Sequence, residues 1–163
     1  MTTEYLHISN EKVVVAAGSL LKLFSIIEAP SGDELARARW HFASALMQHL
    51  ALKERYLYSK LETDLREDVC SYFAVWKREL LDLFALYTER TQEWSTTRAV
   101  ADWTVYRSKA HVVISSILAR LRREETELVP YAVSHQIDIG RPSAVTTNWT
   151  RKAFDLKGSV ETR

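Results

Sequence analysis

Apolar side chains recur every three or four residues along most of the chain, which is the period of an amphipathic α-helix. Four segments carry such a stripe: residues 10–28, residues 33–63, residues 64–93 and a stretch that runs from about residue 98 to Pro130 or slightly beyond. The pattern therefore predicts four long helices.

The breaks between these segments contain residues that end or begin helices. The sequence APSG at residues 29–32 follows the first stripe, where proline cannot continue a helix and glycine permits a turn. Ser31 and Glu34 have the S-x-x-E spacing of a capping box, whose side chains bond the free backbone amides at a helix start. Asp64 and Glu67 repeat that spacing, so we expect each pair to start a helix.

Long helices joined by short connections pack as antiparallel neighbours. The sequence therefore predicts an all-α fold, an up-down-up-down antiparallel four-helix bundle over residues 1–134. The helical period fades after that point. We expect residues 135–163 to form an extended C-terminal tail, partly packed or disordered, with Trp149 and Phe154 as its anchors on the bundle.

Composition and charge exclude several classes of function. The chain has 22 basic and 21 acidic side chains and a net charge of +1, which provides no electrostatic footprint for nucleic acid or an anionic membrane. Cys70 is the only cysteine, so an intrachain disulfide or a cysteine-based metal site is impossible. The longest apolar run, residues 13–27, contains Lys22 and is shorter than a membrane span. We expect a cytoplasmic protein that binds neither nucleic acid nor membrane.

Two polar residues interrupt the apolar stripe of the second predicted helix. His49 and Lys53 follow Leu46 and precede Leu57 at helical spacing. The period therefore points a histidine and a lysine toward the interior of the fold, where unpaired polar groups are costly.

The two residues belong to a stretch that resembles a known family. The sequence HLALKERYLYSKLE, residues 49–62, resembles the H-x-x-x-E-E-x-x-L-(F/Y)-P-x-L segment of hemerythrin-like (HHE cation-binding) domains. The sequence LARLRREETELVPYA, residues 118–132, resembles the same segment in the last helix of that fold. The resemblance covers roughly residues 10–134. It implies a four-helix bundle whose core holds a di-iron centre, with histidines from all four helices and carboxylates from the second and fourth.

Most of the ligand positions that the resemblance implies carry other residues here. His49 stands at a histidine position, but Lys53 stands where the family has a bridging glutamate. In the second copy Arg120 stands at the histidine position, and Glu124 and Glu125 provide the acids. The first and third predicted helices contain no histidine. Because two ligands cannot hold a di-iron cluster and two cations would repel it, we expect no metal and no cofactor.

The cations also suggest what replaces the metal. A glutamate in a core needs a positive partner, or its pKa rises. We therefore expect a polar core cluster of His49, Lys53, Arg120, Glu124 and Glu125. The alternative is that Lys53 and Arg120 extend along apolar surface to reach water and leave the acid inside.

The expected function is that of a non-enzymatic regulatory or protein-interaction module, partnered by another protein or by a second copy of the chain. A middle-helix likeness to bacterial anti-sigma factors, which are metal-free helical bundles of similar length, points the same way. A homodimer could close through the aromatic face of the third helix. The alternative function is that of an iron-binding hemerythrin-like protein for oxygen or metal sensing or storage, with a reduced site of His49, Glu125 and His111.

Overall fold

The computed structural model describes residues 4–144, which form helices and turns without a β-strand. The all-α fold expected from the period of the sequence is therefore confirmed for the described residues. The elements are, in order, α1 (Glu4–Phe24), α2 (Gly32–Lys53), η1 (Glu54–Tyr58), α3 (Ser59–Glu62), α4 (Glu67–Glu93), α5 (Thr96–Ala101), α6 (Trp103–Arg123), η2 (Glu124–Leu128) and α7 (Val129–Ser134).

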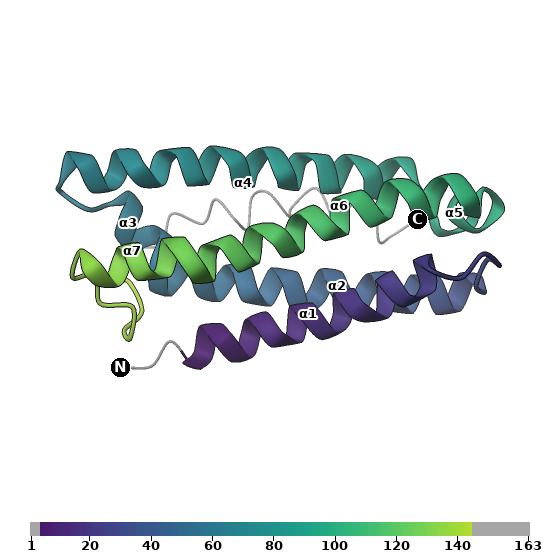
Figure 1. Ribbon diagram of the computed structural model, residues 1–163, viewed down its shortest axis with the longest axis horizontal. Helices are drawn as coiled ribbons and strands as arrows, with labels where there is room; N and C mark the ends of the chain where they lie inside the picture. The colour runs from purple at the N-terminus through teal and green to yellow at the C-terminus, as the bar shows by residue number, and fades with distance from the viewer. Residues whose placement is uncertain (1–3, 145–163) are drawn as a thin grey trace.

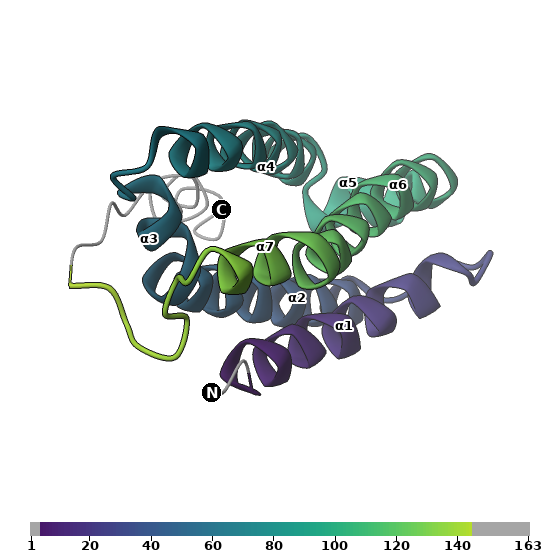
Figure 2. The ribbon, with the colours of Figure 1, turned by 60° about the vertical axis from the view of Figure 1, so that its left-hand side comes forward.

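Helices α1, α2, α4 and α6 extend along the long dimension of the molecule (Figure 1). Helix α1 lies against α2 over most of its length and also contacts α6, and α6 contacts α4 (Figure 2). Two of the long helices continue into short segments. Helix α2 runs through η1 into α3, which we call the first rod, and α6 runs through η2 into α7, which we call the second rod. The short helix α5 covers one end of the assembly and packs against α2 and α6. No helix within residues 4–144 is both long and apolar enough to cross a membrane.

One of the two predicted helix starts is confirmed. Ser31 has extended backbone angles, and its hydroxyl accepts a hydrogen bond of 3.1 Å from the backbone amide of Glu34. The start predicted at Asp64 is wrong. Its carboxylate accepts from the backbone and side chain of Arg66, both at 2.9 Å, and α4 begins only after Arg66. Asp64, three residues before the first helical residue, thus forms a local turn and leaves the amides of the first helical turn without a side-chain cap.

The first and last predicted helices also differ from the structure. Helix α1 begins at Glu4 instead of residue 10, because Leu6 and Ser9 are buried and extend its inward stripe. The last predicted helix is interrupted at Asp102, which separates α5 from α6. The Trp103 ring thereby lies in the core, and its indole donates to the backbone oxygen of Ile26 at 3.0 Å.

The core contains one layer of buried side chains from each long helix. Those no more than 5% exposed include Val13, Ala17 and Leu20 of α1; Leu35, Phe42 and Leu46 of α2; Phe73, Trp76 and Leu80 of α4; and Val113, Ile117 and Leu121 of α6. Each fully buried large apolar side chain stabilises the fold by about 1.5–3 kcal/mol. Phe73, Trp76 and Phe84 of α4 are part of this core, and Tyr72 and Tyr87 pack against it half-buried.

The chain after α7 folds back over the end of the first rod, at η1 and α3. Ile137 and Ile139 are buried, and the Lys60 ammonium donates to the backbone oxygens of Asp138 and Arg141. The start of the predicted tail is therefore packed on the helices. Residues 145–163, which include the expected anchors Trp149 and Phe154, lie outside the described residues.

Replacing Ser31 with alanine is expected to lower the free energy of unfolding by about 1 kcal/mol, because the α2 amide that it caps loses its acceptor. Urea denaturation measures the change. Ser116→Ala is the matched control, since that exposed hydroxyl only bonds the backbone oxygen of Val112 within α6. A loss no larger for Ser31→Ala than for Ser116→Ala would show that the cap contributes nothing.

Candidate functional site

Each of the two rods contains one π-helical turn, η1 in the first and η2 in the second, and both turns lie near the same end of the molecule. The turn in η1 is closed by the Ser59 amide bonding to the backbone oxygen of Glu54, and the turn in η2 by the Val129 amide bonding to Glu124. Both bonds span five residues, one more than in an α-helix. In the second rod the wide turn directly precedes Pro130, whose missing amide would otherwise interrupt the α-helical ladder.

A salt bridge in the protein interior joins these two turns. Lys53, the last residue of α2, is 1% exposed, and its Nζ lies 3.3 Å from Oε2 of Glu124, which is 0% exposed. Glu124 is the first residue of η2. An ammonium and a carboxylate that are distant in sequence thus neutralise each other without access to water.

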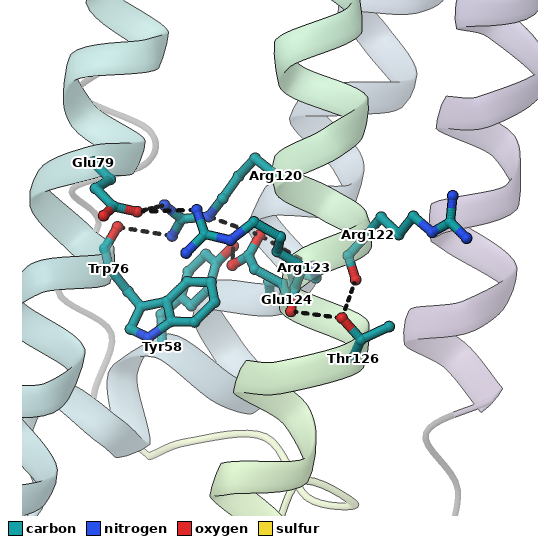
Figure 3. Close-up of polar contacts among 9 residues, drawn as sticks. Tyr58, Trp76, Glu79, Arg120, Arg122, Arg123, Glu124 and Thr126 are labelled. Carbon is teal, nitrogen blue, oxygen red and sulfur yellow. Dashed lines mark hydrogen bonds and ion pairs between the residues drawn. The ribbon is translucent and has the colours of Figure 1, made fainter.

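Two further groups bind the same carboxylate. The buried phenol of Tyr58 donates a hydrogen bond to Oε1 of Glu124, and Nε of Arg120 lies 3.6 Å from Oε2 (Figure 3). Burial, together with the negative charge of Glu124, holds the pKa of Tyr58 well above its usual value, so the phenol keeps its proton. The carboxylate is therefore surrounded by two cations and one neutral donor.

Arg120 carries the network outward from the core to α4. Its guanidinium lies over the Trp76 ring, 4.9 Å from the ring centroid, and donates to the Trp76 backbone oxygen at 2.7 Å. Nη1 of the same guanidinium is 3.6 Å from Oε2 of Glu79, which is half-exposed and also lies 3.4 Å from Nη1 of Arg123 (Figure 3). The second cation of the cluster is thus balanced by a surface acid, and Lys53, Arg120, Glu124 and Glu79 together carry no net charge.

His49 is buried on the same rod but bonds in a different direction. Its Nδ1 lies 2.9 Å from the hydroxyl of Ser9 on α1, and its Nε2 has no hydrogen-bond partner among residues 4–144. Burial, and then the nearby Lys53 charge, lowers the pKa of His49 to about 3. The imidazole is therefore neutral near pH 7.

The structure does not bring the remaining predicted residues to this cluster. Glu125 is one-third exposed and lies 3.7 Å from Nδ1 of His7, and His111 is exposed on α6. The alternative metal set of His49, Glu125 and His111 is therefore not assembled. Residues 4–144 contain no group of three His, Cys, Asp or Glu side chains placed to hold a metal ion. A lysine and an arginine beside one carboxylate are not a donor set for iron.

Tyr58 could not be predicted from the sequence as a partner of Glu124. Five residues separate it from Lys53, and positions five apart are about 140° apart around an α-helix. The wide turn of η1 removes most of that angle and places both side chains on Glu124. Glu79 and the backbone oxygen of Trp76 could not be predicted either. Only the apolar stripe and the ligand positions of the resemblance pointed to site residues, and these groups belong to neither.

The free energy of unfolding is expected to fall as the pH is lowered from about 6.5 to about 3. In the unfolded chain His49 takes up a proton below its ordinary pKa of 6.5, and in the folded chain only below about 3. The unfolded state thus binds one more proton in this window, which costs stability at up to about 1.4 kcal/mol per pH unit. Urea titrations across this range should show a shallower pH dependence for His49→Gln than for the wild type.

The matched control for that series is His111→Gln, because His111 is exposed. It should keep the wild-type pH dependence. Identical slopes for His49→Gln and the wild type would contradict the assignment of a neutral, buried His49.

Comparison with known proteins identifies no relative of the chain. No family model, no curated protein and no solved structure matches it. The inference of function therefore rests on the side chains and their geometry.

Proposed function

We propose that the chain is a hemerythrin-like, up-down-up-down four-helix bundle that has exchanged its di-iron centre for a salt bridge and acts as a non-enzymatic regulatory or protein-interaction module in the cytoplasm. The contacts of α1 with α2 and α6, and of α4 with α6, support this topology. So do the short connections between the rods.

The observation that carries the proposal is the ion pair of Lys53 with Glu124. Lys53 stands where the resemblance implies a bridging glutamate, and Glu124 stands at the corresponding position of the second copy of the segment. Here one of them is a cation, 3.3 Å from the other. A positive charge about 4 Å from a metal ion would oppose its binding by several kcal/mol, even at the effective dielectric of a protein. Glu124 is also occupied by the Tyr58 phenol and by Arg120, so little of its capacity as a ligand is left.

The Ser9–His49 pair does not support a hydrolytic function. The hydroxyl and Nδ1 are 2.9 Å apart, as in a nucleophile and its general base. However, both residues are buried, and the pKa of His49 is lowered to about 3, so the imidazole is a poor acceptor for the serine proton. A tie between α1 and α2 accounts for the pair better than catalysis does.

One feature favours the alternative function, an iron-binding protein with a reduced site. Nε2 of His49 is buried and has no hydrogen-bond partner among the described residues. Such a nitrogen is a candidate metal ligand. Lys53 weighs against this alternative, since its charge already lowers the pKa of the same imidazole.

Metal analysis of the purified protein separates the two functions. Protein produced in iron-supplemented medium is expected to contain far less than one iron or zinc ion per chain, and His49→Ala should not change that content. One ion per chain, lost in His49→Ala but kept in the control His41→Ala, whose imidazole is exposed on α2, would refute the proposal and establish the iron-binding alternative.

A further inference from the structure

Helices α1 and α2 leave a surface groove between them on the side away from the core. Its volume is about 570 Å³. The α1 side includes Ile8, Glu11, Val15 and Ala16, and the α2 side includes Ala38 and Ala45. Alanines of both helices line the groove. Because their side chains are short, side chains of another helix can pack close to the backbones of α1 and α2.

Helix α1 also carries large apolar residues on this exposed side, between polar ones that include Glu11 and Lys12. Ile8 is 48% exposed and Val15 is 68% exposed, and they lie seven residues apart on one stripe. Tyr5, 65% exposed, continues that stripe toward the N-terminus. A surface helix normally has one apolar face, so a second one marks a contact with another helix.

The charges on α1 indicate which helix that is. Its first turn carries Glu4 and its last turn carries Lys22, whereas Glu11 and Lys12 are neighbours near its middle. A second copy of α1 in antiparallel orientation therefore brings Glu4 at the start of each helix onto Lys22 at the end of the other. A two-fold axis makes every such contact twice.

One register satisfies the charges and the apolar contacts together. With the two-fold axis at the level of Val13, Glu4 lies opposite the partner's Lys22 and Ile8 lies opposite the partner's Gly18. A side-chain atom added at Gly18 would meet nothing within 4 Å, so the space above this residue is open and can receive an isoleucine. Val15 then covers the aliphatic part of the partner's Glu11.

We propose that the α1/α2 groove is the interface of a homodimer, in which α1 of each copy packs antiparallel against the other. This inference deepens the proposed interaction function and rests on it, by naming the partner as a second copy of the chain. The aromatic residues of α4 are outside this contact, since Phe73, Trp76 and Phe84 are buried within one copy and none of them lines the groove.

The mass of the full-length protein in solution tests the proposal. Light scattering after size-exclusion chromatography should give twice the 18.8 kDa of one chain. Val15→Glu should give a single-chain mass, because a charge at an exposed position leaves the fold intact but is buried in the dimer. The matched control is Val112→Glu on α6, at a position that is 63% exposed and outside the groove, and it should stay dimeric. A single-chain mass for the wild type, or the same loss of dimer in both variants, would overturn the proposal.

Charge exchange tests the antiparallel register. Glu4→Lys places two lysines opposite each other at two symmetric positions and should raise the dimer dissociation constant about tenfold. Adding Lys22→Glu restores both pairs with reversed signs and should return the dissociation constant to near the wild-type value. A double variant as weak as Glu4→Lys would refute this register.

The two proposals fail separately. A metal-free monomer would remove the dimer and leave the function proposed above intact, whereas a dimer with one iron per chain would remove that function and leave the dimer.

Discussion

The fold depends on one electrostatic constraint, that Lys53 and Glu124 must face each other once both are enclosed. Either charge alone in a core would cost several kcal/mol, whereas the pair at 3.3 Å cancels most of that penalty. The cost of separating the charges fixes the position of α2 along the axis of α6, because a shift by one helical turn would leave both charges unpaired. Apolar packing alone would tolerate such a shift better. The pair thus contributes more to the uniqueness of the helix register than to net stability.

Polar contacts around this pair reach all four long helices. Lys53 ends α2 and Glu124 follows α6, while Arg120 of α6 donates to the backbone oxygen of Trp76 on α4. On the other side His49 of α2 is joined to Ser9 of α1. A metal centre with ligands on every helix would tie the same elements together. The proposed loss of iron therefore requires no loss of this cross-linking, since hydrogen bonds and one ion pair supply it.

The helical period was sufficient to predict the all-α fold and the inward direction of Lys53, because both follow from 3.6 residues per turn. It failed where that period changes. The expected inward stripe continued to Glu125, but the wide turn of η2 rotates this residue toward solvent and leaves Glu124 inside. The same kind of turn in η1 is the reason that the contact of Tyr58 with Glu124 could not be predicted. The helix start predicted at Asp64 was wrong because the spacing of a capping box does not reveal that this carboxylate accepts hydrogen bonds from Arg66 instead of capping the helix.

The central claim is that Lys53 and Glu124 stabilise each other inside the protein, and a double-mutant cycle on the free energy of unfolding near pH 7 tests it most directly. Lys53→Met and Glu124→Gln preserve size while each removes one charge. Each single change is expected to destabilise the fold by about 3–5 kcal/mol, and the double variant to lose at least about 2 kcal/mol less than the sum. Additive losses, with a coupling energy near zero, would contradict the account.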